Sequence, residues 1–269
     1  MQSISKLLEE ENIIRSPLWF RVSSILLGGE RGMKAGEYYF SRPQSVLSVA
    51  WRIFRGDHGI ETVRLTIPEG FTVKKISNLF DERFPYFDNE YFEEIAPEGY
   101  LFPDTYFMPV TATATSTIKT LRDNFNRKTD NLSAKILASG KSLEEVVKMA
   151  SIIEAESNRS PDREIVSGIL WKRIAQNVPL QVDASFVYVN GKTTHELTLD
   201  DLKIKSPYNT YINRGLPPTP ISNPGLLSLE AALSPTSTPY FYFLTGKDGQ
   251  MYYAKTFDEH VQNKNKYLK

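Results

Sequence analysis

Two glutamates, Glu154 and Glu156, lie near the end of a stretch that reads as one helix, residues 141–158. Ser142, followed three residues later by Glu145, is a capping box that predicts the start of this helix. A carboxylic acid at the end of a largely apolar helix can stay protonated near neutral pH, because desolvation disfavours its charged form. The stretch could therefore supply a general acid, although solvated helix ends and structural ion pairs are more frequent roles for such glutamates.

Helical periodicity separates the two carboxylates. At about 100° per residue, Glu154 falls on the same face as the apolar Val147 and Ala150, whereas Glu156 falls beside Met149 on another flank. The pattern therefore predicts that Glu154 is the more buried of the two.

The remaining residue types argue against several other chemistries. The sequence has no cysteine, which excludes disulfides, thiolate metal sites and a cysteine nucleophile. The three histidines, His58, His195 and His260, have no metal-ligand spacing, so we expect surface or hydrogen-bonded residues. The sequence also lacks a Gly-x-Ser-x-Gly elbow, a phosphate-cradling glycine loop and a dinucleotide fingerprint. We therefore expect neither a metal nor a cofactor.

Carboxylate chemistry remains, and with it the cleavage of glycosidic bonds. A hydrolase needs a second carboxylate as nucleophile or as base for water. Asp183 is the best candidate, although capping the helix that follows it is the more frequent role for such a residue. A transglycosylase in which a sugar hydroxyl attacks internally needs no activated water, so one carboxyl can act as acid and then as base.

Composition bounds the size and the partners of the protein. The 269 residues, 41% of them hydrophobic, can bury a sizeable core in one large domain or two smaller ones. Thirty-two basic residues balance 32 acidic ones, so nothing favours nucleic acid as a partner. No apolar run approaches the roughly 18 residues of a membrane span.

The elements that must position these residues indicate an α+β fold. We expect a small N-terminal module, residues 1–97, followed by a mixed α+β domain, residues 98–269, with the boundary at Pro97-Glu98-Gly99. In the N-terminal module, residues 4–10 align with residues 76–82 at an offset of 72. This repeat predicts that the sequence begins inside a module, and two unrelated amphipathic helices are the alternative.

The second half of the predicted larger domain changes character. Residues 178–225 are rich in proline and hold only short helical pieces, at 183–188 and 198–203. A hairpin with strands at 240–245 and 250–255 follows, and then a helix capped by Thr256. Both strands are rich in tyrosine, so one face could contact a ligand, although an aromatic core strand is the more frequent explanation.

Several distinctive motifs follow one another in the sequence. They are Glu98-Gly99-Tyr100-Leu101-Phe102-Pro103-Asp104-Thr105-Tyr106, residues 149–157 with Glu156-Ser157, Pro179-Leu180-Gln181-Val182-Asp183, Ser206-Pro207-Tyr208-Asn209-Thr210-Tyr211, Gly215-Leu216-Pro217-Pro218, Pro220-Ile221-Ser222-Asn223-Pro224-Gly225 and Tyr240-Phe241-Tyr242-Phe243. In this order and spacing they resemble one family, the MltG-type (YceG-like) endolytic murein transglycosylases, and the resemblance covers essentially residues 60–269.

The resemblance implies a bacterial enzyme that cleaves the β-1,4 bond between N-acetylmuramic acid and N-acetylglucosamine within nascent glycan strands. The muramyl 6-hydroxyl would attack its own anomeric carbon and leave a 1,6-anhydro end. Residues 1–97 are similar to the LysM-like module of the family, and residues 98–269 would be its catalytic domain. Family members are usually held at the outer face of the cytoplasmic membrane by one N-terminal helix, which this sequence lacks. Peptidoglycan would be the partner, with cell-wall synthases as further candidates.

The resemblance also assigns roles to single residues. It favours Glu156, which is followed by Ser157, as the residue that acts as general acid and then as base. Helical periodicity, in contrast, predicts that Glu154 is the more buried glutamate. Glu154 would then be a structural residue paired with an arginine such as Arg163 or Arg173. The expected lining of the glycan groove is Ser157, Gln181, Asp183, Tyr208, Asn209, Thr210 and Tyr211. Residues 208–211 and the neighbouring prolines could equally serve only to lock the loop.

Two alternative functions stay open at this point. One is a muramidase-type hydrolase that uses Glu156 and Asp183 as its two carboxylates. The other is a non-catalytic peptidoglycan-binding protein, which would leave the Glu156-Ser157 helix and the polar loops without a role.

Overall fold

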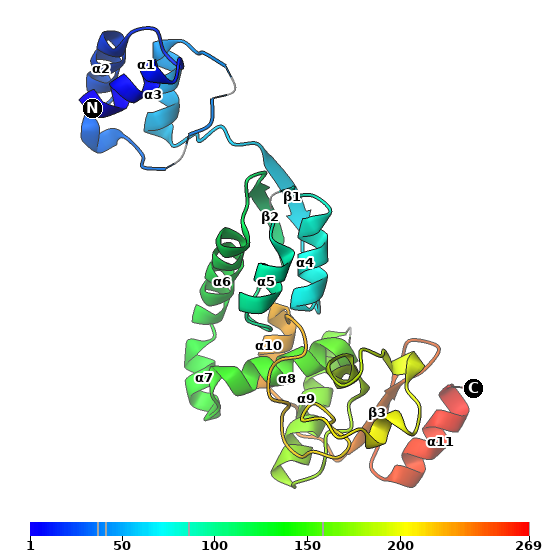
Figure 1. The fold of residues 1–269 in the computed structure, drawn as a ribbon. Coiled ribbons are helices and arrows are strands. Elements are labelled where there is room, and N and C mark those ends of the chain that lie inside the picture. Colours follow the sequence, from blue (N-terminus) through cyan, green and yellow to red (C-terminus); the bar gives the residue numbers. More distant parts are fainter. Residues whose placement is uncertain (37, 41, 86, 158, 269) are drawn as a thin grey trace. The chain divides into compact units, whose positions relative to one another are not determined.

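The computed structural model describes residues 1–36, 38–40, 42–85, 87–157 and 159–268 (Figure 1). The predicted α+β class is confirmed: among these described residues helices dominate, and two small two-stranded sheets accompany them. The chain divides into two compact units, residues 1–63 with 107–111, and residues 64–106 with 112–269. The boundary between functional modules that we expect at residue 97 stays a prediction.

The first unit is built from three helices, α1 (Gln2–Glu10), α2 (Pro17–Leu26) and α3 (Val46–Arg55), and a 3-10 turn, η1 (Glu30–Gly32). Ser16 and Ser45 cap α2 and α3, because their hydroxyls accept backbone N–H groups of the first turn. The fully buried Phe20 and Val49 join these helices in one apolar core.

Strand β1 (Thr62–Thr66) pairs with β2 (Thr105–Pro109), and helices α4 (Val73–Asp81) and α5 (Asn89–Ile95) lie between them in the chain. In α4, Phe80 stacks on Phe84 and Phe87 with ring centroids 5.0 and 4.8 Å apart. Both segments of the repeat at offset 72 are helical, in α1 and α4. Helical structure in both segments is expected whether the sequence begins inside a repeated module or the two helices are unrelated.

The second unit is organised around helix α8 (Leu143–Glu156). The predicted capping box is confirmed, since the Ser142 hydroxyl accepts the Glu145 N–H and the Glu145 carboxylate accepts the Ser142 N–H. Asn158, in the last part of the predicted stretch, lies outside the described residues. The other helices of this unit are α6 (Ala114–Asp130), α7 (Ser133–Ser139), α9 (Ser160–Ala175) and α10 (Leu226–Leu233). Most of α8 is buried because α9 and α10 pack on it.

The proline-rich stretch 178–225 contains three 3-10 helices, η2 (Asp183–Tyr188), η3 (Thr194–Glu196) and η4 (Asp201–Lys203). Only the second half of the helical piece predicted at 198–203 is therefore helical. The predicted hairpin is confirmed as β3 (Tyr242–Thr245) against β4 (Met251–Ala254), and Thr256 caps α11 (Phe257–Tyr267). Within the described ranges, no helix has both the length and the apolar character needed to cross a membrane.

Candidate active site

Helix α8 ends at Glu156, which lines a cavity of about 760 Å³ in the second unit. The cavity is bounded by the end of α8, the chain around Asp183, strand β3 and helix α11. Gln181 and Tyr211 from the proline-rich stretch also line it. The fold thus brings four of the predicted site residues, Glu156, Gln181, Asp183 and Tyr211, to one cavity.

Glu156 has the electrostatic character of a general acid. Burial raises the pKa of its carboxyl group, and the negative charge of Asp183 raises it further. A hydrogen bond from the backbone N–H of Ala184 opposes these effects, and the pKa of Glu156 is raised from 4.5 to about 7. A carboxyl group with this pKa can both give and take a proton near neutral pH.

Asp183 is held in place beside Glu156. The hydroxyl group of Tyr211 donates a hydrogen bond of 2.6 Å to its Oδ1 atom. The Tyr211 ring in turn packs edge-on against the fully buried Phe186, with 6.0 Å between the ring centroids. The carboxylate next to the proposed acid therefore has a fixed orientation.

Glu154 has a different environment. Its side chain is only 8% exposed, and its Oε1 atom lies 2.8 Å from Nη2 of Arg163. Its other oxygen, Oε2, accepts the backbone N–H of Gly225 at 2.9 Å. Periodicity therefore predicted the burial of Glu154 correctly, and the predicted pairing with Arg163 is confirmed. Arg173 contacts neither glutamate and donates to backbone carbonyl groups.

Two further predicted residues use their side chains within the protein. The hydroxyl group of Ser157 donates to the carbonyl oxygen of Arg159 at 3.3 Å, and Ser157 is 4% exposed. Tyr208 stacks on Tyr188, with 5.1 Å between ring centroids, and its hydroxyl lies 2.9 Å from that of Thr219. Their predicted contact with substrate stays a prediction.

The side chains of Asn209 and Thr210 form hydrogen bonds with backbone groups of the proline-rich stretch. Asn209 is fully buried, and its amide nitrogen donates to the carbonyl oxygens of Leu202 and Ile204. Thr210 is 3% exposed, and its hydroxyl both accepts the Val182 N–H and donates to the Val182 carbonyl oxygen at 3.0 Å. Thr210 therefore holds the segment that carries Asp183 next to the one that carries Tyr211, and Asn209 ties the latter segment to residues 202–204.

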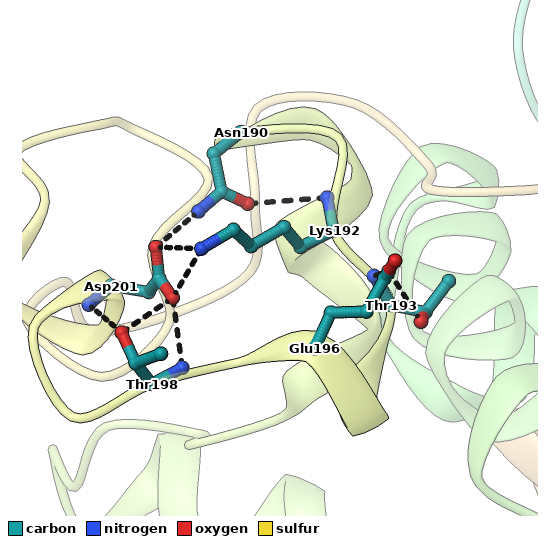
Figure 2. A network of polar contacts seen from close by, with 6 residues as sticks. All are labelled: Asn190, Lys192, Thr193, Glu196, Thr198 and Asp201. Atoms are coloured by element: carbon teal, nitrogen blue, oxygen red, sulfur yellow. Dashed lines mark hydrogen bonds and ion pairs between the residues drawn. The ribbon is translucent and has the colours of Figure 1, made fainter.

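A polar network around Asp201 fixes the loop that brings Thr194 to the cavity (Figure 2). The Asp201 carboxylate accepts hydrogen bonds from Asn190, from Lys192 and from both the N–H and the hydroxyl of Thr198. The contact with Lys192 is the largest cause that lowers the pKa of Asp201 to about 2. The carboxylate therefore keeps its charge, and the loop keeps its conformation, throughout the neutral range.

Comparison with known proteins identifies the family to which the chain belongs. The model of the YceG-like family matches residues 1–266. The chain belongs to the YceG-like family.

Individual proteins that are similar to this YceG-like chain support the same family assignment. A protein of Bacillus subtilis (strain 168) named endolytic murein transglycosylase is 29% identical, over all of this chain and 82% of the relative. A Streptococcus pneumoniae protein of the same name is 30% identical over 62% of this chain, and the match spans 31% of that longer protein. A crystal structure of a putative YceG-like protein from Listeria monocytogenes superposes with a TM-score of 0.70 at 28% identity, covering 97% of this chain and 94% of the other.

Sequence reasoning offered the tyrosine-rich hairpin strands as one alternative ligand-contacting face, but it missed the other residues of this wall of the cavity. Tyr242, Lys247, Phe257, His260 and Lys264 come from the β3–β4 hairpin and α11 and line the same space as Glu156. The tyrosine content of the two strands could have indicated this wall from the sequence. Nothing in the sequence indicated that the basic residues line the cavity. Among the side chains that the structure describes, which exclude that of His195, no three potential metal ligands gather in one place.

The structural role of another carboxylate, that of the half-buried Glu98, was also missed. Its oxygens accept hydrogen bonds from the Val73 N–H, the Asn223 amide and the Tyr188 hydroxyl. Burial is the largest cause that raises the pKa of Glu98. Tyr188 ends η2, the 3-10 helix that begins at Asp183, so Glu98 fixes the far end of the element that carries the second carboxylate of the cavity.

Proposed function

We propose that this chain is an endolytic peptidoglycan lytic transglycosylase, which cleaves the β-1,4 bond between N-acetylmuramic acid and N-acetylglucosamine and leaves 1,6-anhydro ends. Two lines of support carry the proposal. Relatives in the YceG-like family are named endolytic murein transglycosylases. The cavity also presents one carboxyl group, that of Glu156, whose pKa is raised to about 7.

In the proposed reaction, Glu156 acts twice. Its protonated carboxyl group first donates a proton to the glycosidic oxygen, and the bond from that oxygen to the muramyl anomeric carbon breaks. The muramyl 6-hydroxyl oxygen then bonds to the anomeric carbon and returns its proton to the Glu156 carboxylate. The acid is regenerated, no water is consumed, and the products are an anhydro end and a free 4-hydroxyl end.

Asp183 supports this chemistry through its charge. Its carboxylate keeps Glu156 protonated at a higher pH and would favour the positive charge that develops at the anomeric carbon in the transition state. Gln181 and Tyr211 also line the cavity and would contact sugar hydroxyl and N-acetyl groups. Because Asp183 faces the same cavity, a muramidase that activates water through it is the second candidate function.

The proposed substrate also assigns roles outside the cavity. We place the enzyme at the outer face of the cytoplasmic membrane, where nascent strands are, and cell-wall synthases are candidate partners there. The LysM-like module predicted for residues 1–97 would hold glycan strands near the catalytic domain, residues 98–269.

Digestion of purified sacculi, followed by mass analysis of the released products, tests the function. The wild type should release products with anhydromuramyl ends, each lighter by one water than the hydrolysed form, and Glu156→Gln should release none. Glu144→Gln is the matched control, because Glu144 is an exposed residue of the same helix. Circular dichroism would show that both variants are folded.

Other results of this digestion would support a different function. Hydrated ends from the wild type would establish a muramidase. Binding to sacculi without any release would establish a binding protein. Full activity of folded Glu156→Gln would refute the assignment of the acid.

A further inference from the structure

The charged groups around the cavity divide by element. The acidic residues Glu156 and Asp183 come from α8 and η2, whereas the basic residues Arg173, Lys247 and Lys264 come from α9, the hairpin turn and α11. We call Arg173, Lys247, Lys264 and His260 the basic wall. The reaction proposed above uses the acidic groups and leaves the basic wall without a role.

Arg173 is a buried cation that lacks an acidic partner. It is 4% exposed, yet its guanidinium donates only to neutral oxygens, among them the carbonyl groups of Phe241 and Leu180, both at 2.8 Å. The guanidinium carbon also lies 4.8 Å from the centroid of the Tyr242 ring. Buried charges are rarely left without an opposite charge. Within the described part of the chain no carboxylate pairs with Arg173, so a ligand could supply one.

The other members of the wall extend this positive region. Lys247 and Lys264 are exposed, and neither side chain forms an ion pair among the described residues. The charges of both Lys264 and Arg173 lower the pKa of His260, after the larger effect of burial, so the two cations reach the same imidazole ring. The Lys247 N–H donates to the Tyr267 carbonyl at 3.0 Å, which ties the hairpin turn to α11.

His260 contributes a buried polar atom without a hydrogen-bond partner to the basic wall. Its ring stacks on Tyr242, with 5.4 Å between the centroids, and its buried Nδ1 atom has no hydrogen-bond partner among the described residues. A buried nitrogen without a partner costs free energy that a bound ligand could recover.

Tyr211 relates the basic wall to the proposed acid. The negative charges of Asp183 and Glu156 raise the pKa of Tyr211, after burial, whereas the positive charge of Arg173 lowers it. The Tyr211 hydroxyl is therefore within electrostatic reach of both groups. A ligand bound at Glu156 would meet the basic wall within the same cavity.

We propose that the basic wall binds a carboxylate of the peptide that peptidoglycan carries on its muramic acid residues, so that the enzyme prefers peptide-bearing strands over bare glycan. This inference rests on the proposed function and names a subsite of the same cavity. In peptide-bearing strands the sugars carry no charge, because the lactyl carboxyl group of each muramic acid forms the amide bond to its peptide, so the anionic groups along the strand are those of the peptides. The anion complements the basic wall, whose positive charges pair with no carboxylate among the described residues.

Steady-state cleavage of two substrates tests the proposal. Soluble peptide-bearing strands would be compared with bare strands, made by removing the peptides with an amidase and converting the lactyl carboxyl groups that this exposes into amides. For Lys247→Gln/Lys264→Gln, we expect KM for peptide-bearing strands to rise roughly fivefold with kcat unchanged, since each lost contact is a solvent-exposed charge pair. KM for bare strands should not change, and the difference should shrink at high salt.

The matched control is Lys205→Gln/Lys255→Gln, which removes two exposed lysines outside the cavity lining. This control should behave as the wild type on both substrates. An equal rise in KM on both substrates, or none on either, would overturn the subsite. Failure of the proposed function looks different, because the wild type would then cleave neither substrate.

A binding measurement separates carboxylate recognition from other contacts with the peptide. Calorimetry with Glu156→Gln would compare a disaccharide-peptide bearing free carboxylates with the same compound after chemical amidation. We expect amidation to weaken binding severalfold in this background and to have a clearly smaller effect once Lys247 and Lys264 are also replaced by glutamine, because Arg173 and His260 remain. Equal affinity for both compounds would overturn the proposal.

Discussion

Arg163 links Glu154 to the backbone that follows the proposed acid. Its Nη2 atom lies 2.8 Å from Glu154 Oε1, and its Nε atom donates to the carbonyl oxygen of Ser157 at 3.0 Å. Because Glu154 also accepts the N–H of Gly225, the residue before α10, the same contacts join the end of α8 to the start of α10. Glu154 therefore fixes the helix end from which Glu156 enters the cavity.

Replacing Glu154 should destabilise the fold more than it impairs the chemistry. Glu154→Ala leaves the buried Arg163 without its nearest partner, and we expect the free energy of unfolding to fall by about 3–5 kcal/mol. Urea denaturation of the purified variant measures this change. Glu144→Ala is the control, because the exposed Glu144 pairs with Lys148 on the same helix, and a pair with a solvent-exposed member contributes at most about 1 kcal/mol. Equal losses for the two variants would contradict the structural role of Glu154.

Activity should fall as the pH rises through the pKa of Glu156. The first step needs the protonated carboxyl group, so kcat/KM should decrease above about pH 7. Asp183→Asn removes the charge that raises this pKa, and the decrease should begin at a lower pH. The midpoint should stay above 4.5 because burial, the larger cause, remains. Rates of product release measured between about pH 5 and about pH 9 test both statements, and an unshifted profile for a folded Asp183→Asn would contradict them.

The same group should make stability depend on pH. The pKa of Glu156 is about 7 in the folded state and near 4.5 when unfolded, so the folded state binds the proton more tightly. The stabilisation from its protonated form is complete below pH 4.5 and is lost as the pH rises through 7. Glu156→Gln stays neutral, so its Tm should exceed that of the wild type at pH 8. Thermal unfolding at several pH values measures the difference, and a lower Tm for Glu156→Gln at pH 8 would contradict the assignment.

Local sequence patterns predicted the elements that depend on neighbouring residues. The capping box at Ser142, the burial of Glu154 and the hairpin after residue 240 all follow from spacings of a few residues. The likeness to a family then singled out Glu156, which periodicity alone did not. Helical periodicity reports burial against the core and carries no information on which flank meets a cavity.

The rest of the site depends on contacts that join distant segments. Asn209 and Thr210 matched a motif, but their side chains bond to the backbone at 182, 202 and 204, which no local pattern encodes. Lys247 and Lys264 reach the cavity only because the hairpin and α11 pack beside it. Glu98 meets Tyr188 across 90 residues of chain. Such contacts follow from the tertiary fold and not from the segments themselves.

The hydrogen bond between Tyr188 and Glu98 should contribute measurably to stability. Tyr188→Phe removes a donor to a largely buried carboxylate, and we expect the free energy of unfolding to fall by about 1.5–3 kcal/mol. Tyr252→Phe is the control, because the Tyr252 hydroxyl donates to the exposed Asp248 at 2.6 Å and its loss should change stability little. Chemical denaturation of both variants provides the comparison. An unchanged stability for Tyr188→Phe would show that the contact is replaced by water at no cost.

Gly99, which follows Glu98, should tolerate no side chain. Its φ is +89°, and an added Cβ would lie 2.5 Å from Cβ of Pro220 and 2.9 Å from Cγ1 of Val147 on α8. Both neighbours are rigid parts of the packing around α8, so we expect Gly99→Ala to lower the free energy of unfolding by about 3 kcal/mol or more. Gly140→Ala isolates the backbone effect, because Gly140 has a φ of +68° and no atom within 4 Å of an added Cβ. Its cost should be only about 1 kcal/mol. The difference between the two variants in urea denaturation then measures the close approach itself, and equal costs would contradict the packing of this turn against α8.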